Sequence, residues 1–352
     1  MIKAIIDNNI LNDILDIEKN KVLLNTVKIP TNLSNKFRKN TKKMSSYASN
    51  KIEGNPLSYQ QANFAIESKN RHLLKPEQEI RNYYLALGFL EKKLENRHSL
   101  SKKMILEVQK QICDGEPKEK IGLRGPMPPG VLFAVWNDDG TPAYIPPDSR
   151  EVSNLLDELC EYVNASNDHP LIKAAIIHYQ LVTIHPFEDG NGRTARILSS
   201  YYLSLAGYGF KNIGSLEEFM SYDIDEYYDS IQMGLPVSYY DGRDNPPHPE
   251  IWFRYFLKVF KLYASKVLSI AMRETRNNED ERQSHLSNKA KVFLEYLRKH
   301  HFVSFAPIDM AEKLKVSNRT IINWCSELTS NGYLKPMIVN KRIRNYELLE
   351  TK

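Results

Sequence analysis

The run at residues 185–196 reads His-Pro-Phe-Glu-Asp-Gly-Asn-Gly-Arg-Thr-Ala-Arg and constrains this chain more than any other segment. It combines a titratable base, two carboxylates, an amide side chain between two glycines, and two arginines. A hydroxyl nucleophile needs a base, and phosphate oxygens bind well to glycine amides and forked guanidinium groups. The run therefore predicts a loop that holds a phosphate group next to a general base.

The flanking sequence predicts that this loop connects two helices. Apolar residues at helical spacing over residues 171–182 predict an amphipathic helix that ends near His185. Helix-forming residues follow over 193–205. The Gly-Asn-Gly segment at 190–192 then lies just before the second helix, where free N–H groups and the helix dipole favour an anion.

Three kinds of charged residue in the run have distinct predicted uses. Arg193 and Arg196 are three residues apart and so share one face of the predicted helix. Asp189 is a hard oxygen ligand, suited to a Mg²⁺ ion that bridges phosphates. His185 is the candidate base, because histidine ordinarily titrates near neutral pH. A capped, solvated connection between helices is the simpler alternative, but the joint occurrence of these residues argues against it.

The run resembles the signature of the Fic family, His-Pro-Phe-x-Asp/Glu-Gly-Asn-Gly-Arg-x-x-Arg, at every specified position. Members mostly transfer AMP from ATP to a Ser, Thr or Tyr hydroxyl of a target protein, and relatives of the fold remove AMP or transfer UMP, phosphate or phosphocholine. The resemblance implies that His185 is the general base, that Asp189 holds Mg²⁺, and that Asn191 and the glycine amides form an anion hole. Phe187 is expected to anchor the loop in the core. The implied ATP-binding set is Asp189, Gly190, Asn191, Gly192, Arg193, Thr194, Ala195 and Arg196.

A second segment, Ser-Asn-Lys-Ile-Glu-Gly at residues 49–54, resembles the inhibitory motif of the same family, Ser/Thr-x-x-x-Glu-Gly/Asn. The resemblance implies that Ser49, Glu53 and Gly54 belong to an inhibitory helix. Glu53 would pair with Arg196 and crowd out the γ-phosphate of ATP. The same residues are also typical of an ordinary helix end, with Gly54 as the C′ residue, and both interpretations can hold together.

A predicted β-hairpin precedes the signature. Residues 131–136 are apolar and strand-like, and an Asp-Gly turn at 139–140 separates them from a second run at 141–145. The Fic family has a hairpin flap here, which can bind an extended target segment by strand addition. A hairpin without a binding role is the alternative. Residues 122–125 and 144–147, on either side, also resemble the family. The expected flap residues are Val131, Leu132, Phe133, Ala134 and Val135.

Two adjacent tyrosines follow the signature. Tyr227 and Tyr228 resemble a family element that helps to bind the adenine base, and this places them in the expected ATP site. Packing of the aromatic rings in the core is the alternative.

The C-terminal residues carry the positive charge of the chain. Residues 287–352 contain 12 lysines and arginines against 6 aspartates and glutamates, whereas the whole chain has a net charge of +5. Predicted helices at 290–300, 307–314 and 319–330, followed by a hairpin over 333–348, resemble a winged helix–turn–helix. Lys341, Arg342 and Arg344 would then face a DNA phosphate backbone. The major-groove residues would be Asn318, Arg319, Thr320 and Asn323. A protein-interaction or dimerisation module is the alternative.

These segments predict a mainly α-helical fold with four regions. They are an N-terminal helical region with the inhibitory helix (1–76), a Fic helical core with a β-hairpin flap (77–271), a polar linker or solvated helix (272–286), and a C-terminal winged-helix domain (287–352). A homodimer is left open.

The cysteines and the hydropathy pattern bear on the compartment. The three cysteines are odd in number and far apart, which favours a reducing compartment such as the cytoplasm. Residues 1–24 mix charged and apolar residues, and no apolar run reaches about 18 residues. We therefore expect neither a signal peptide nor a membrane partner.

Two functions of different class compete. The first is a self-inhibited protein adenylyltransferase that uses ATP and Mg²⁺, acts on a target protein the sequence does not name, and is also a candidate for removing AMP. The second is a DNA-binding regulator whose Fic core senses nucleotide. The intact signature favours the first, because loss of His185 or Asp189 would have favoured the second.

Overall fold

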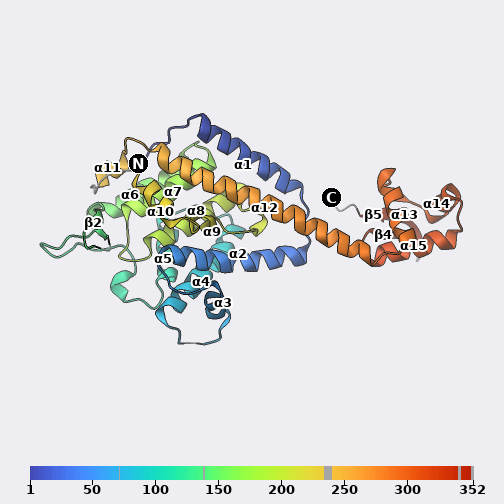
Figure 1. The fold of residues 1–352 in the computed structure, drawn as a ribbon, viewed down its shortest axis with the longest axis horizontal. Coiled ribbons are helices and arrows are strands. Elements are labelled where there is room, and N and C mark those ends of the chain that lie inside the picture. The colour runs from blue at the N-terminus through green and yellow to red at the C-terminus, as the bar shows by residue number, and fades with distance from the viewer. Residues whose placement is uncertain (71, 138, 234–239, 340–341, 350–352) are drawn as a thin grey trace. The chain divides into compact units, whose positions relative to one another are not determined.

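The computed structural model describes residues 1–70, 72–137, 139–233, 240–339 and 342–349. Clustering of contacts divides it into two compact units, Met1–Val22 with Thr31–Leu268, and Leu23–Pro30 with Ser269–Lys352. The mainly helical fold that the sequence predicts is confirmed (Figure 1). The first unit holds most of the predicted N-terminal region and of the predicted core, while residues 23–30 and 269–271 fall in the second unit, and the domain boundaries stay a prediction.

The helices and strands up to the end of the long helix α12 are, in chain order, α1 (Asn8–Thr26), α2 (Thr31–Ile52), α3 (Tyr59–Glu67), α4 (Lys75–Glu95), α5 (Lys102–Ile112), η1 (Lys118–Lys120), β1 (Val135–Trp136), β2 (Pro142–Tyr144), α6 (Ser149–Ala165), α7 (Pro170–Ile184), α8 (Asn191–Leu203), η2 (Ser204–Tyr208), η3 (Phe210–Asn212), α9 (Leu216–Met220), α10 (Ile224–Gln232), α11 (Tyr240–Asp244) and α12 (Glu250–Ser284).

Helix α7 is the centre of the first unit and packs along α8. The sequence predicts an amphipathic helix here, and this prediction is wrong in one respect. From Leu171 to Ile184 every residue except Val182 is buried, because α6, α8, α11 and α12 cover the helix from different sides. A helix that is apolar on all faces is typical of a core position. The Trp252 indole of α12 donates a hydrogen bond to the Ala175 carbonyl of α7 (2.9 Å) and fastens this packing.

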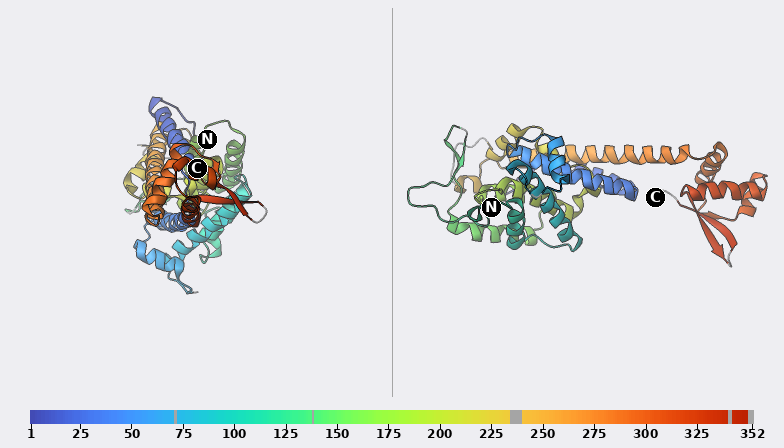
Figure 2. Two further views of the ribbon diagram at one scale, coloured as in Figure 1. Left: turned by 90° about the vertical axis from the view of Figure 1, so that its right-hand side faces the viewer. Right: turned by 90° about the horizontal axis from the view of Figure 1, so that it is seen from below.

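Helix α12 is one continuous helix that α1 follows closely (Figures 1 and 2). Lys261 of α12 pairs with Asp13 of α1, and Arg254 pairs with Asp7 just before α1. The segment at 272–286, predicted as a linker or a solvated helix, is helical as far as Ser284.

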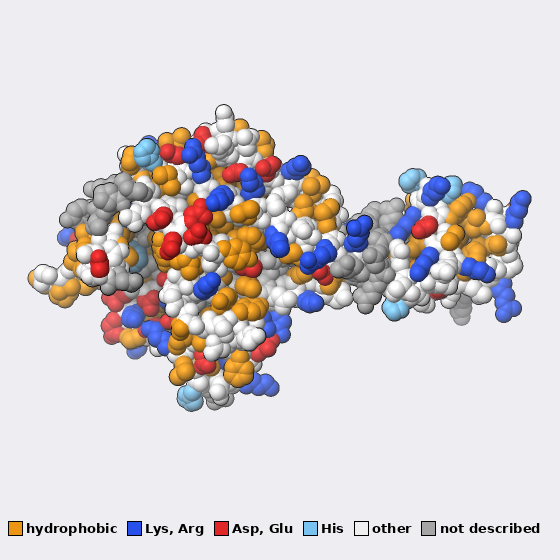
Figure 3. All heavy atoms as spheres, in the orientation of Figure 1, with side chains coloured by type: hydrophobic (Ala, Val, Ile, Leu, Met, Phe, Trp, Pro, Cys, Tyr) orange, Lys and Arg blue, Asp and Glu red, His pale blue; other side chains and the backbone are white. Residues whose placement is uncertain are grey.

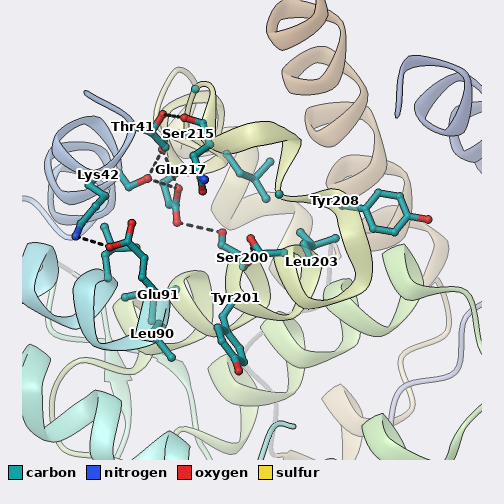
Figure 4. Close-up of a pocket in the computed structure, with 18 of the residues that line it drawn as sticks. Thr41, Lys42, Leu90, Glu91, Ser200, Tyr201, Leu203, Tyr208, Ser215 and Glu217 are labelled. Atoms are coloured by element: carbon teal, nitrogen blue, oxygen red, sulfur yellow. Dashed lines mark hydrogen bonds and ion pairs between the residues drawn. The ribbon is translucent and has the colours of Figure 1, made fainter. Parts of the chain in front are cut away.

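A buried carboxylate joins four helical segments behind the signature loop. Glu217 of α9 is 2% exposed and accepts hydrogen bonds from Ser45 of α2 (3.0 Å), Ser200 of α8 (3.1 Å), Ser215 (2.8 Å) and Tyr83 of α4 (3.3 Å). Figure 4 shows Glu217 between Ser215 and Ser200 at the wall of a small cavity. Because four hydroxyl groups surround the carboxylate, its burial is compensated.

The hairpin before α6 is shorter than the sequence predicts. Only Val135 and Trp136 form the first strand, pairing with Tyr144 and Pro142. Val131, Leu132, Phe133 and Ala134 lie outside the strand. A turn closed by the Val131 N–H and the Pro128 carbonyl (3.0 Å), with Gly130 at φ +80°, bends the chain just before them. Asp138, in the predicted turn, lies outside the described residues.

The second unit has the three helices and the hairpin that the sequence predicts, and a short strand between the first two helices that it does not. Its elements are α13 (Asn288–Lys299), β3 (Ser304–Phe305), α14 (Pro307–Leu314), α15 (Asn318–Ser330), β4 (Leu334–Val339) and β5 (Arg342–Leu348). The strands form an antiparallel sheet in the order β3-β5-β4. Phe293, Ile321, Leu328 and Tyr346 lie in its core. The N-cap residue of α15 is Ser317, and Asn318 is the first residue of the helix.

Two further expectations concern cysteines and membranes. Cys113, Cys160 and Cys325 are all buried and unpaired. Within the described ranges, no helix has the length and apolar character needed to cross a membrane.

The buried hydrogen bonds of Glu217 lead to a prediction about stability. Glu217→Ala removes the acceptor that Tyr83 of α4 and Ser200 of α8 share, while Ser45 of α2 keeps Ser215 as an acceptor (2.9 Å), so we expect the free energy of unfolding to fall by about 1–3 kcal/mol. Urea unfolding followed by circular dichroism measures this. The exposed Glu161 of α6 provides the control, because Glu161→Ala should stay within about 0.5 kcal/mol of wild type. Equal stability of both variants would contradict a structural role for Glu217.

Candidate active site

The signature loop runs from the end of α7 to the start of α8 and is held by its own side chains. His185 ends α7 in the left-handed conformation (φ +48°), and Gly190 precedes α8 at φ +83°. Phe187 is fully buried, which agrees with its expected role as an anchor. The Asn191 amide accepts from the Phe187 N–H (3.0 Å) and donates to the Phe187 carbonyl (2.8 Å). The Asn191 side chain therefore braces the loop, and its expected part in an anion hole stays a prediction.

Two other residues of the expected ATP set also lie away from the loop surface. Thr194 and Ala195 are fully buried within α8, where they pack in the core. A helix has one face toward the loop and another toward the core, and these two residues fall on the core side. The backbone N–H groups at the start of α8, together with Gly190 and Gly192, remain the groups suited to an anion.

The His185 ring is oriented by the backbone. Its Nδ1 lies 3.2 Å from the Val182 carbonyl. Because a carbonyl only accepts, Nδ1 carries the proton in the neutral ring and Nε2 is left as an acceptor. Burial lowers the pKa of His185 to about 4, with a smaller contribution from Arg124, while the Val182 carbonyl, Glu53 and Asp189 act in the opposite direction. The sequence predicts a near-neutral pKa, and burial is the reason for the difference.

Asp189 lies between two cations. Its Oδ1 accepts from Arg193 Nη2 (2.7 Å), and its Oδ2 lies 3.9 Å from Lys120 Nζ. Within the part of the chain that the structure describes, no group of three or more His, Cys, Asp or Glu side chains could hold a metal ion. A metal at Asp189 would therefore need phosphate oxygens and water as its other ligands.

Arg196 brings the two motifs together. The guanidinium is 1% exposed and donates to the Ser49 hydroxyl (2.9 Å), the Ser49 carbonyl (2.9 Å) and Glu53 Oε1 (2.6 Å). Gly192 makes room for this contact, since a Cβ atom at its position would lie 2.3 Å from Glu53 Oε1. The pair Glu53–Arg196 that the sequence motif implies is thus present in the structure.

Glu53 lies just beyond the end of α2 and is only partly covered. Its side chain is 34% exposed. Burial raises the pKa of Glu53, but Arg196 and Arg193 outweigh this, and the pKa lies below its ordinary value. Glu53 is therefore ionised at neutral pH. Gly54 follows at φ +81°, so the helix-end interpretation of the motif holds as well.

The two tyrosines of α10 differ. Tyr227 is buried, accepts from Arg196 Nη1 (3.2 Å) and lies 2.9 Å from His178 Nε2, so it packs behind Arg196, and its contact with adenine stays a prediction. Tyr228 is exposed, and its hydroxyl donates to the Ile52 carbonyl (3.1 Å). Asp225 and Asp229 of α10 are exposed. Figure 3 shows that Asp and Glu side chains gather on this face of the molecule. Because the acidic residues occupy the outer face of α10, Tyr227 falls on the inner face, toward the core.

One residue near the loop carries no predicted role. Arg124 is buried, and its Nε donates to the His185 carbonyl (2.8 Å). The acceptors of Arg124 are backbone carbonyls, which leave no signal in the sequence. The one signal that could have pointed to Arg124 is that Gly-Leu-Arg-Gly at 122–125 resembles the family.

The expected DNA-binding residues lie at the start of α15. Asn318, Arg319 and Asn323 are exposed, whereas Thr320 is half-buried and bonded to the Ser317 hydroxyl (2.7 Å). The apolar Ile322 is exposed among them. Arg342 and Arg344 are also exposed, and Lys341 lies outside the described residues. DNA binding stays a prediction.

Comparison with known proteins identifies the domain that holds this site. Residues 99–203 match the model of the Fic/DOC family, and the chain therefore contains a Fic/DOC domain that includes the signature loop.

Two curated relatives are protein adenylyltransferases named Fic. The protein from Culex quinquefasciatus is 31% identical over 169 residues, and that from Drosophila melanogaster is 30% identical over 168 residues. Each alignment covers 46% of this chain and 32% of the relative. The chain therefore aligns with about a third of the length of these relatives.

Solved structures share the fold. A Fic family protein from Desulfovibrio desulfuricans G20 superposes with a TM-score of 0.63 at 18% identity, covering 99% of this chain and 98% of that one. Fic-1 from C. elegans superposes with a TM-score of 0.56 at 22% identity, covering 74% of this chain and 71% of that one.

The lowered pKa of His185 can be tested directly. We expect the ring ¹⁵N shifts of His185, assigned with the His185→Ala variant, to show a neutral ring with the proton on Nδ1 from pH 8 down to pH 5. Since the folded pKa of about 4 lies below the ordinary 6.5, the contribution of His185 to stability is lost as the pH falls from 6.5 toward 4. A titration midpoint between pH 6 and 7 would contradict the burial argument.

Proposed function

We propose that this chain is a self-inhibited protein adenylyltransferase, which transfers AMP from ATP to a Ser, Thr or Tyr hydroxyl of a target protein. The observation that carries the proposal is the Glu53–Arg196 contact beside a loop that presents a neutral histidine and a helix N-terminus. The partial alignment with proteins named adenylyltransferase supports the reaction class.

The base in the proposed reaction is His185. Its Nε2 accepts the proton of the target hydroxyl, whose oxygen forms a bond to the α-phosphorus while the bond from that phosphorus to the β-phosphate oxygen breaks. Pyrophosphate leaves, and AMP stays on the target. The fixed Nδ1–H···Val182 contact keeps Nε2 available for this proton (3.2 Å).

Charge neutralisation comes from the start of α8. The N–H groups of Gly192 and Arg193 lie in the first turn, where an anion is favoured. Arg193 and Arg196 would hold the triphosphate, as forked guanidinium groups suit phosphate oxygens. In this conformation both are paired with carboxylates, Arg193 with Asp189 and Arg196 with Glu53.

Mg²⁺ fits the donor set at Asp189. The carboxylate is partly exposed, and its Oδ2 is 3.9 Å from Lys120, too far for a hydrogen bond. Asp189 would hold the ion, with phosphate oxygens and water completing its shell. The ion supplies neutralisation of phosphate charge when bound.

Self-inhibition follows from the position of Glu53. The carboxylate occupies the Arg196 group that a γ-phosphate would use, and its negative charge repels that phosphate. Glu53 is also displaceable, because it lies beyond the last turn of α2 and is a third exposed, whereas Arg196 is fixed by Ser49 and Tyr227. The inhibited state is therefore one that a movement of the segment around Glu53 would relieve.

Three further expectations belong with this proposal. Tyr228, the exposed one of the two tyrosines, would contact the nucleotide. Val131 and Leu132, which are exposed, and strand β1 would contact the target protein. Buried and unpaired cysteines fit the cytoplasm.

The first prediction concerns the base. His185→Ala should lower AMP transfer from labelled ATP by on the order of 10²–10⁴-fold, because general-base catalysis is lost. ATP binding should stay nearly intact, since His185 makes no phosphate contact in this scheme. Calorimetric titration with ATP provides the control. An unchanged transfer rate would remove His185 from the mechanism.

The second prediction concerns inhibition. Glu53→Gly should raise incorporation of labelled AMP into the protein itself and into targets well above wild type, because Arg196 is freed for the triphosphate. Glu91 of α4, which pairs with Lys42 of α2, offers a matched control whose Glu91→Gly variant should behave like wild type.

Arg196→Ala should not reproduce the gain, because it also removes the phosphate contact. Equal incorporation by Glu53→Gly and wild type over a range of ATP concentrations would refute self-inhibition. Should the chain also remove AMP, Glu53 would orient the attacking water, and Glu53→Gly would lose removal while it gains transfer.

The alternative function is a DNA-binding regulator with a nucleotide-sensing core. Exposure of Arg319 and Asn323 on α15, in a unit with the predicted helix and strand order, is the observation that favours it. Such binding would weaken steeply with salt. Absence of labelled product from the Glu53→Gly variant, combined with salt-dependent duplex binding, would favour this alternative.

A further inference from the structure

Arg124 lies beneath the signature loop and contacts two segments at once. Its Nε donates to the His185 carbonyl (2.8 Å), its Nη2 donates to the Pro147 carbonyl, and its backbone N–H donates to the Pro186 carbonyl (2.9 Å). Its guanidinium also lies over the Phe133 ring, 4.6 Å from the centroid. One side chain thus joins the catalytic loop to both ends of the hairpin segment that includes β1 and β2.

The partners of Arg124 are unusual for a buried cation. Buried arginines ordinarily pair with carboxylates, but the hydrogen-bond acceptors that the described residues provide for Arg124 are backbone carbonyls. Burial lowers the pKa of Arg124, and the charge of the nearby Asp148 carboxylate offsets this only in part. Such an arrangement is costly, and it fixes the direction of the two peptide groups that it contacts.

His185 needs this kind of restraint. Residues other than glycine adopt φ +48° only where the surroundings hold them there. The His185 N–H reaches the Leu181 carbonyl at 3.3 Å and the ring reaches Val182 at 3.2 Å, both within α7. Arg124 is the contact that holds the peptide group on the other side of His185.

We propose that Arg124 is a positioning residue that fixes the orientation of the His185 base and makes it depend on the hairpin segment over the site. This inference rests on the proposed transfer reaction and extends it. Arg124 donates a hydrogen bond only to the backbone of His185, its charge is a smaller cause of the lowered pKa of the ring, and it does not touch the reacting atoms in this scheme. When a target occupies the hairpin, movement of Pro147 would pass through Arg124 to the catalytic loop. Movement of Phe133 would reach the loop through Arg124 and also directly, because the Phe133 and His185 ring centroids are 6.0 Å apart.

The geometry requires the fork of an arginine. Nε and Nη2 diverge toward His185 and Pro147, whereas the single ammonium group of lysine cannot make both contacts in the same directions. Arg124→Lys keeps the positive charge and the approximate volume, and therefore tests position and not charge.

The experiment compares Arg124→Lys with Arg243→Lys, both in the Glu53→Gly background. Arg243 is a matched control, because it is also buried, also lies over an aromatic ring (Tyr144, 4.6 Å) and also donates to a carbonyl (Ile231, 3.3 Å). We expect Arg124→Lys to lower kcat at least tenfold with less than a twofold change in the Kd for ATP. Arg243→Lys should lower the urea midpoint by a similar amount with kcat within twofold of the parent.

A second readout does not depend on activity. The ¹⁵N shifts of the His185 ring should move in Arg124→Lys from a single Nδ1–H form toward a mixture of tautomers, and should stay unchanged in Arg243→Lys. Unchanged shifts in Arg124→Lys, or equal losses of kcat in both variants, would overturn the proposal. If Glu53→Gly itself transfers no AMP, the proposed function fails, and the ring shifts still decide the role of Arg124.

Discussion

The buried guanidinium of Arg196 is the group on which the rest of the site depends. It is removed from water, and a buried charge is tolerated only where partners surround it. Ser49 and Glu53 from the end of α2, together with Tyr227 from α10, supply those partners. Two segments distant in the chain are therefore held around the start of α8, and a triphosphate that binds Arg196 must displace one of these partners.

A second set of hydrogen bonds joins α2 to α8, one helical turn away from Arg196. Arg196 and Ser200 are one turn apart on α8, and Ser45 and Ser49 are one turn apart on α2. Arg196 binds Ser49, while Glu217 binds both Ser45 and Ser200. Helix α2, which leads to Glu53, is thus held by the Arg196 guanidinium at one turn and by the Glu217 carboxylate at the next. Glu53, beyond the helix end, is the most exposed partner, and so it can move while α2 stays in place.

Part of this arrangement could be predicted from the sequence, because its signals are local. The helix ends on either side of the loop follow from the glycine at 190 and the apolar run before His185, and the contact of Glu53 with Arg196 follows from two short motifs. The burial of Phe187 could likewise be predicted from the signature itself.

What the sequence could not predict depends on contacts made far along the chain. Helix α7 is buried on all sides because α6 and α12 cover it, and no periodicity within α7 records this. Asn191 and Arg124 bind backbone carbonyls, which every residue type provides, so their partners leave no sequence signal. The low pKa of His185 likewise depends on its burial in the folded chain.

In the proposed inhibited state, Glu53 excludes the γ-phosphate and not the nucleotide as a whole. The most direct measurement is the ratio of the Kd values for ATP and ADP, determined by calorimetry for wild type and for Glu53→Gln, which keeps the side-chain size and removes the charge. We predict that the wild type binds ADP at least as tightly as ATP, and that Glu53→Gln shifts the ratio at least tenfold in favour of ATP. An unchanged ratio would contradict the account.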